Sequence, residues 1–503
     1  MAEKPLKSLA KETAIYGLSS IVGKFINWCL VPFYTFVLES SADYGIVTNL
    51  YAWTAFLVVI LTYGMETGFF RFANKNKAET DKVYGVTLTS VGSTSLLFAL
   101  CCIFFSGSIA EHMGYANHAE FIAMLGVVVA MDAFASIPFA YLRFRSQALK
   151  FAGLKLLYII LNVFFNLFFF LLCPWLMQEY PAWVDWFYRP EYGVGYVFVA
   201  NILSTALQTL CVLPFANIRF RFDATLLKNI LRYSLPLLVL GIAGIMNQTV
   251  DKIIFPFLIE DKAEATTQLG IYGACFKIAM VMMMFTQAFR YAYEPFIFAR
   301  HKDKNSLSAY ADAMKFFVIF SLLIFLGMTF YLDLLKYLIR SDYWEGLKVV
   351  PVVLMSYIFQ GIFFNLSLWY KLTDKTMYGA WLSILGLLIT LAVNIVFVPL
   401  YGYMASAWAS FLCYSTMMFV SYFWGQRHMA VAYDLKSIGL YTLAATILYG
   451  VSIGLESPSA PLNIGFRSLL LAAFVAMILK RDLPLQELPL IHKFIKTDKQ
   501  KKQ

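Results

Sequence analysis

Residues 377–424 read MYGAWLSILGLLITLAVNIVFVPLYGYMASAWASFLCYSTMMFVSYFW, and none of these positions holds Asp, Glu, Lys or Arg. A helix needs about 20 mainly apolar residues to cross the hydrocarbon core of a membrane. The stretch is long enough for two such helices, and the motif PLYG at residues 399–402 separates its two apolar runs. It therefore predicts two membrane-spanning helices that run in opposite directions.

The same pattern continues along the whole chain. Of its 503 residues, 60% are apolar and only 14% are charged, whereas a soluble domain carries about 25% charged residues. This composition excludes a cytosolic enzyme, a disordered scaffold and a coiled coil. It predicts an all-α integral membrane protein with fourteen transmembrane helices, at roughly 13–37, 46–68, 85–109, 120–141, 151–175, 196–216, 233–258, 269–294, 312–332, 349–370, 377–398, 403–424, 436–454 and 463–480.

The basic residues predict the orientation of these spans. With the N-terminus placed in the cytoplasm, 28 of the 40 Lys and Arg residues fall in inside segments, five in outside segments and seven within spans. Such an excess of basic residues marks the cytoplasmic side. We therefore expect a multi-pass protein of the bacterial inner membrane with both termini in the cytoplasm. The net charge of +10 then reflects topology, not a nucleic-acid site, and the basic tail at 480–502 is expected to meet anionic phospholipids.

The two halves of the chain resemble each other. Residues 192–200 read YGVGYVFVA and residues 401–409 read YGYMASAWA, and each motif follows a span that contains an asparagine, Asn166 or Asn394. Chance similarity between apolar helices is the alternative explanation. A repeat predicts two pseudo-symmetric six-helix bundles, and two bundles with a cleft between them can rock to give alternating access.

This repeat divides the chain into four parts. The predicted parts are a six-helix N-terminal lobe at 1–216, a cytoplasmic amphipathic linker at 217–232, a six-helix C-terminal lobe at 233–425, and two further helices with a basic cytoplasmic tail at 426–503. The linker, which alternates basic and apolar residues, is expected to lie on lipid headgroups.

Two stretches carry a resemblance to a known family. NIVFVPLYGYMASAWAS at 394–410 and GIYGACFKIAMV at 270–281 are similar to motifs of the polysaccharide transport branch of the MOP (multidrug/oligosaccharidyl-lipid/polysaccharide) exporter superfamily. The resemblance covers essentially the whole chain. It implies a MATE-like fold and a flippase that moves undecaprenyl-diphosphate-linked oligosaccharides, such as O-antigen, capsule or exopolysaccharide repeat units, from the inner to the outer leaflet. Other members of the superfamily move lipid II or export cationic drugs.

Four basic residues within the predicted spans are candidates for binding the substrate. Ionisable side chains in hydrocarbon are costly and usually face a cavity or a partner. Lys24, Lys252, Lys277 and Arg290 lie within predicted spans, and we expect them to contact the diphosphate of the headgroup. A salt bridge with a buried acid is the alternative for Lys24, and a pair with Glu294 at i+4 is the alternative for Arg290.

Three other residues are candidates for coupling transport to a gradient of H+ or Na+. Asp132 is the only acid deep in the first half of the chain, and Asp251 and Asn247 belong to the polar stretch MNQTVDKIIF at 246–255. An isolated carboxylate in the membrane is a candidate ion carrier. A pair with Lys24, which would neutralise both side chains, is the alternative for Asp132.

Basic residues outnumber acidic ones within the spans, which favours an anionic lipid-linked substrate. The alternatives are a MATE-like cation-coupled multidrug exporter and a membrane-embedded polysaccharide polymerase or glycosyltransferase. The largest outside loop, at 177–193, is short for an enzyme site, and the sequence has no HExxH or phosphate-loop motif. We therefore expect no enzymatic activity, catalytic residue, cofactor or metal. A polysaccharide polymerase and other assembly proteins are possible partners.

Overall fold

The computed structural model describes residues 3–75, 77–215, 222–300, 306–455, 457 and 459–482, with the backbone alone at 3–16, 18–20, 77, 292, 294–300, 306 and 460. Every regular element in these ranges is helical. The α-helices are α1 (Glu3–Val37), α2 (Ser41–Thr62), α3 (Met65–Lys75), α4 (Thr80–Phe104), α5 (Ser106–Met113), α6 (Ala119–Phe144), α7 (Ala148–Leu167), α8 (Cys173–Glu179), α9 (Gly195–Val212), α10 (Ala224–Leu258), α11 (Lys262–Arg300), α12 (Ser306–Phe330), α13 (Leu332–Leu335), α14 (Val350–Leu366), α15 (Leu368–Leu372), α16 (Met377–Tyr401), α17 (Tyr403–His428), α18 (Leu435–Gly454) and α19 (Ala460–Arg481).

Short 3-10 and π-helical segments connect or extend some of these α-helices. A π-helical segment at Phe168–Leu172 joins α7 to α8. The 3-10 segments are Lys77–Glu79, Pro181–Trp183, Pro190–Tyr192, Leu213–Phe215, Lys336–Leu338 and Ser341–Val349.

The predicted all-helical membrane fold is confirmed. Within the described part of the chain, twelve helices are long and apolar enough to cross a membrane. Helix α1 adds a shorter apolar segment at Ile21–Val37. Helix α17 is 26 residues long but carries four buried serines, which lower its mean hydropathy, and it is not among the twelve. The count of fourteen spans therefore stays a prediction.

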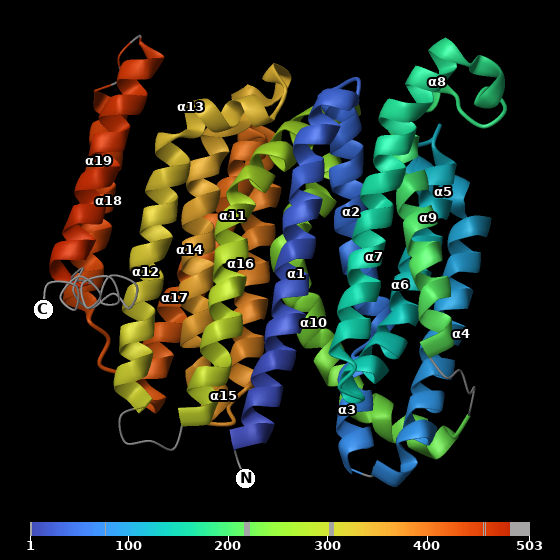
Figure 1. Ribbon diagram of the computed structural model, residues 1–503, viewed down its shortest axis with the longest axis horizontal. Helices are drawn as coiled ribbons and strands as arrows, with labels where there is room; N and C mark the ends of the chain where they lie inside the picture. Colours follow the sequence, from blue (N-terminus) through green and yellow to red (C-terminus); the bar gives the residue numbers. More distant parts are fainter. Residues whose placement is uncertain are drawn as a thin grey trace, which may run out of the picture.

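The long helices run side by side from one end of the molecule to the other (Figure 1). Helices α1–α9 occupy one side, and α11–α17 occupy the other. The charge distribution of the sequence predicts that the upper end in Figure 1 faces away from the cytoplasm, and we call it the outer end. The opposite end, where the N-terminus lies, is called the inner end.

Local sequence sets where individual helices begin and end. Ser40 caps α2, because its hydroxyl accepts the Asp43 backbone N–H and the Asp43 carboxylate accepts the Ser40 backbone N–H. The helix ends where Tyr63 and Gly64 adopt left-handed backbone angles, with φ of 33° and 69°. The single span predicted at 46–68 is therefore two helices, α2 and the amphipathic α3.

The start of α10 is fixed to the N-terminal lobe. The Asp223 carboxylate accepts the Leu226 backbone N–H at 2.9 Å and lies 2.6 Å from the Lys82 ammonium. These two donors hold the pKa of the Asp223 carboxyl below its ordinary value. Residues 224–232 of the predicted linker thus form the first turns of α10, and 217–221 lie outside the described residues.

The two halves meet through equivalent residues of α2 and α11. A Cβ added to Gly45 would overlap the carbonyl oxygen of Thr266, and a Cβ added to Gly270 would overlap that of Ser41. Ser41 and Thr266 are 225 positions apart, and so are Gly45 and Gly270. This reciprocal contact is what a pseudo-twofold axis between two repeats produces. The repeat read from the sequence therefore has a structural counterpart here.

The last two helices form a hairpin that packs against α12, away from the N-terminal helices (Figure 1). Near the outer end, Arg467 of α19 binds the Asp333 carboxylate at 2.5 Å. Near the inner end, the Lys315 ammonium of α12 lies 2.9 Å from Asp482, which also accepts the Tyr441 hydroxyl at 2.6 Å. Two ion pairs therefore fasten the hairpin to the C-terminal lobe.

Candidate functional site

Two adjoining cavities lie between the lobes. The larger, which we call the central cavity, has a volume of about 280 Å³ and is lined by α2, α10, α11, α14 and α17. The second, which we call the inner cavity, has a volume of about 250 Å³ and is lined by α1, α10, α11 and α14. Gln248 and Met283 line both cavities, so the two are neighbours.

All four cations predicted to bind the substrate line these cavities. Lys252 and Lys277 line the central cavity, and Lys24 and Arg290 line the inner cavity. They come from three helices, α1, α10 and α11, so the fold brings together residues from both halves of the chain. Their role in binding the substrate stays a prediction.

The charges of these residues act on one another. Lys24 and Arg290 are close enough for their charges to repel. Lys277 is likewise repelled by both Lys24 and Lys252. Among the described side chains that line the two cavities, none is an Asp or a Glu. A bound anion would relieve this repulsion, because opposite charges attract strongly where the effective dielectric is low.

Two aromatic side chains contact residues that carry these charges, Arg290 and Lys277. The Arg290 guanidinium lies over the Phe364 ring, 4.5 Å from its centroid, which is a cation–π contact. The Glu294 side chain, the alternative partner of Arg290, lies outside the described residues. The Trp28 indole N–H donates to the backbone carbonyl of Lys277 at 2.7 Å and so ties α1 to α11.

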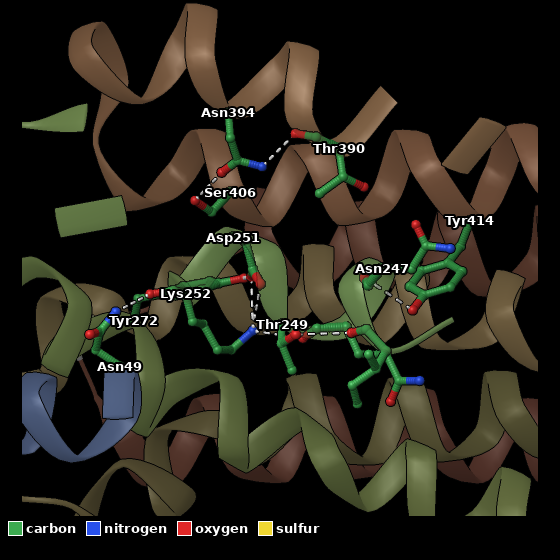
Figure 2. Close-up of polar contacts among 12 residues, drawn as sticks. Asn49, Asn247, Thr249, Asp251, Lys252, Tyr272, Thr390, Asn394, Ser406 and Tyr414 are labelled. Atoms are coloured by element: carbon green, nitrogen blue, oxygen red, sulfur yellow. Dashed lines mark hydrogen bonds and ion pairs between the residues drawn. The ribbon is translucent and has the colours of Figure 1, made fainter. Parts of the chain in front are cut away.

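Asp251 and Lys252 form an ion pair at the wall of the central cavity (Figure 2). The Lys252 ammonium lies 2.8 Å from one carboxylate oxygen of Asp251 and 3.1 Å from the other. The Tyr272 hydroxyl of α11 donates to the same carboxylate at 2.8 Å. Across the lobe boundary, the Asn49 amide of α2 donates to the backbone carbonyl of Lys252 at 2.7 Å.

Asn247 also lines the central cavity, and its contacts join three helices of the C-terminal lobe. Its side-chain amide donates to the backbone carbonyl of Ser383 in α16 at 2.9 Å. Its own backbone carbonyl accepts the Tyr414 hydroxyl of α17 at 3.4 Å. These bonds hold α10 against α16 and α17, and the predicted part of Asn247 in ion coupling stays a prediction.

Asp132 lies apart from these residues. It belongs to α6, and it lines neither the central nor the inner cavity. The positive charge that acts on it comes from Lys155 of α7, not from Lys24, which was the alternative partner. The Lys155 ammonium also lies over the Phe139 ring at 4.2 Å. Whether Asp132 carries a coupling ion stays a prediction.

Sequence reasoning missed several polar residues of the site, and Gln360 and Tyr272 are two of them. Gln360 of α14 lines the inner cavity, and Tyr272 of α11 donates to Asp251. Gln360 interrupts the apolar run VVLMSYIFQGIFF at 352–364, and a polar amide within such a run could have identified it as a cavity residue. The hydroxyl of Tyr272 gave no signal, because tyrosines are common throughout this chain and its contact depends on how α10 and α11 pack.

Comparisons with known proteins identify the family and the fold. Residues 9–299 match the family described as "Polysaccharide biosynthesis protein". A comparison with curated proteins finds no match.

Among solved structures, the chain is similar to the lipid II flippase MurJ in an inward closed conformation. The TM-score is 0.72 at 13% identity, over 92% of this chain and 98% of that one. It is also similar to an inward-facing MATE multidrug resistance transporter, with a TM-score of 0.60 at 14% identity over 82% and 94% of the two chains. An outward-facing MATE transporter gives 0.55 at 13% identity, over 83% and 95%. The family match covers more than half of the chain, and the fold is that of the flippase and the MATE transporters. The chain belongs to the polysaccharide biosynthesis protein family.

Proposed function

We propose that the chain is a flippase for undecaprenyl-diphosphate-linked oligosaccharides in the bacterial inner membrane. The observation that carries the proposal is the placement of four cations on two adjoining cavities whose described lining holds no carboxylate. A diphosphate would add negative charge to these cavities, where the positive charges of the four residues repel one another. Arginine also matches phosphate oxygens with two parallel hydrogen bonds, so Arg290 suits the headgroup.

The cavities and the lobes suit transport by alternating access. The headgroup enters the inner cavity from the cytoplasm, while the polyprenyl chain stays in the lipid. The lobes then rock about their interface, and the headgroup leaves on the outer side. An H+ or Na+ gradient drives the cycle, with Asp132, Asp251 and Asn247 as the proposed coupling residues. A polysaccharide polymerase is a proposed downstream partner.

A cation exporter is less well supported by the same cavities. A site for organic cations needs negative charge or electron-rich rings that are not already occupied by the protein's own cations. Here Lys252 lies 3.8 Å from the centre of the Phe276 ring, and Arg290 lies over Phe364. The protein's own charges thus occupy two of the aromatic faces that a cationic drug would use.

The test is a leaflet assay with purified protein in liposomes that contain an undecaprenyl-diphosphate-linked glycan. A probe added outside reports how much glycan has reached the outer leaflet. We expect the Lys24→Ala and Arg290→Ala variants each to lower the rate at least tenfold. Lys150→Ala is the matched control, because Lys150 is an inner-end cation that lies over the Phe215 ring and lines neither cavity.

Each outcome of this assay has a distinct meaning. Translocation that survives both substitutions would reject the cavity cations as the site while leaving a flippase. Translocation that falls equally in Lys150→Ala would mean that any loss of positive charge impairs the protein. Extrusion of a cationic dye without glycan translocation would overturn the proposal in favour of a drug exporter.

A further inference from the structure

Lys252 lies between a buried carboxylate and the open space of the central cavity. Its ammonium contacts both oxygens of Asp251 (Figure 2), and Lys252 lines the cavity, whereas Asp251 does not. The side chains are 11% and 4% exposed, respectively. An anion in the cavity can therefore reach the ammonium but not the carboxylate behind it.

The other contacts of Lys252 are weak and lie toward the cavity. The ammonium is 3.4 Å from the backbone carbonyl of Gln248 and 3.8 Å from the centre of the Phe276 ring. Both Gln248 and Phe276 line the central cavity. A lysine side chain is flexible, with several rotatable bonds. These contacts allow the ammonium to turn toward the cavity once a stronger acceptor than a carbonyl is present there.

The Asp251 carboxylate depends on two donors. One is the Lys252 ammonium, and the other is the Tyr272 hydroxyl at 2.8 Å. Removing the partner of a buried charge is costly, because the charge that remains is neither solvated nor paired. Any anion that takes Lys252 must therefore offset the cost of leaving Asp251 with the tyrosine hydroxyl alone.

We propose that Asp251 is an internal competitor of the substrate for Lys252 and that it limits how tightly the anionic headgroup binds. In the empty cavity Asp251 neutralises Lys252, and the arriving diphosphate draws the ammonium away. When the headgroup leaves, the ammonium returns to Asp251, and the recovered ion pair favours release. Asp251 is thus a positioning residue for Lys252, in addition to the part in ion coupling proposed above. The inference rests on the proposed function.

The competition predicts opposite effects when the carboxylate is removed and when its tyrosine donor is removed. Asp251→Asn keeps the shape of the side chain but removes its charge, so Lys252 is free for the substrate. Tyr272→Phe removes the second donor, so the carboxylate holds Lys252 more strongly. We expect the first substitution to tighten binding about tenfold and the second to weaken it about threefold. A merely structural role would weaken binding in both variants.

The test measures calorimetric binding of geranyl diphosphate to the full-length protein in detergent. It compares wild type, Asp251→Asn, Tyr272→Phe, Lys252→Met and the double variant Asp251→Asn/Lys252→Met. The double variant should bind as weakly as Lys252→Met alone, because the gain in Asp251→Asn requires Lys252. Melting curves and size-exclusion profiles confirm that each variant is folded. Asp223→Asn, which removes the carboxylate of an ion pair outside both cavities, is the matched control and should bind like wild type.

Transport kinetics provide an independent readout. In the liposome assay, Asp251→Asn should lower both KM and kcat, because tighter binding slows release of the headgroup. Unchanged or weaker binding in Asp251→Asn, or tighter binding that persists in the double variant, would overturn the inference. If wild type neither binds the diphosphate nor moves the glycan, the proposed function itself fails. If wild type does both and Asp251→Asn behaves like wild type, only the internal competitor is rejected.

Discussion

The interface between the lobes differs sharply between its outer end and its middle. At the outer end, α2 and α11 touch through Gly45 and Gly270 with no room for a side chain. Arg340 adds two bonds there, from its guanidinium to the backbone carbonyls of Leu38 and Glu39 at 2.8 and 3.0 Å. In the middle, the same two helices line the central cavity with its cations. One pair of helices thus forms both a closed contact and the wall of the site.

This difference shows how two tasks of the proposed transporter, controlling access to the site and binding the substrate, can be separated along one interface. The glycine contact contains no side chain that must be desolvated or reoriented when the lobes part. The cavity contains fixed charges that act on whatever enters it. A change at the outer end should therefore alter access, and a change in the middle should alter affinity and selectivity.

The largest effect is expected when the glycine contact is broken. In Gly270→Ala, the new Cβ would overlap the backbone of Ser41, so the outer end cannot close. Overpacking of this kind typically costs about 1–3 kcal/mol, and we expect glycan translocation to fall at least tenfold in liposomes. The control is Gly244→Ala, since a Cβ at Gly244 meets nothing within 4 Å. Equal loss in both variants would refute a special role for the outer contact.

A somewhat smaller effect is expected from a negative charge in the middle. Gln248 lines both cavities, and Gln248→Glu would place a carboxylate among the four cations. We expect binding of geranyl diphosphate to weaken about tenfold, which corresponds to about 1.4 kcal/mol. Calorimetry at constant ionic strength measures this change. Gln248→Met removes the amide without adding charge and should weaken binding far less. Equal losses would show that the amide matters and the charge does not.

Arg340→Ala tests the hydrogen bonds that reinforce the outer end. The variant loses both bonds to the backbone of the N-terminal lobe, and hydrogen bonds from a charged donor contribute about 1.5–3 kcal/mol. We expect a lower melting temperature and a loss of translocation of about threefold, with unchanged binding of geranyl diphosphate. Arg340→Lys should recover only part of the loss, because lysine lacks the planar fork of donors. Weakened diphosphate binding in Arg340→Ala would contradict the separation of access from affinity.

The smallest effect is expected at the tie between α1 and α11. Trp28→Phe removes the indole donor to the backbone carbonyl of Lys277 but keeps an aromatic ring. One neutral hydrogen bond contributes about 0.5–1.5 kcal/mol, so translocation should fall about twofold. The unfolding free energy in denaturant and the initial rate in liposomes measure the two effects. A tenfold loss would mean that Trp28 contacts the substrate directly.

Much of the fold could be predicted because the membrane imposes a simple rule on the sequence. Apolar runs long enough to cross the bilayer stand out by composition. The basic connections between them predict an orientation, which stays a prediction. The repeat could be proposed from the Tyr-Gly motifs that follow spans containing Asn166 and Asn394. In the structure each of these asparagines donates to the backbone carbonyl four residues earlier at 2.7 Å. The break at Tyr63 and Gly64 could not be predicted, because it depends on a left-handed backbone inside an apolar run.

The site could be predicted only in part. Lys24, Lys252, Lys277 and Arg290 were recognisable because a charge within an apolar run is costly without a cavity or a partner. The basic partners of Asp251 and Asp132 could not be recognised from the sequence. Asp251 and Lys252 are adjacent on a helix and point about 100° apart, and only the long lysine side chain lets them meet. Asp132 has Lys155 beside it because α6 packs against α7, which no local pattern reveals.

The attachment of the C-terminal hairpin has a consequence for the motion of the whole molecule. Both of its ion pairs, Arg467–Asp333 and Lys315–Asp482, end on the lobe that contains α12 and α13. The hairpin α18–α19 is therefore attached, in the described part of the chain, to that lobe alone. As a result, the C-terminal lobe presents a larger surface to the surrounding lipid than the N-terminal lobe does. In the proposed rocking of the lobes, the C-terminal lobe carries the hairpin and therefore displaces more lipid than the N-terminal lobe. The bilayer would then resist the movement of the C-terminal lobe more than that of the N-terminal lobe, although the two lobes have nearly the same fold.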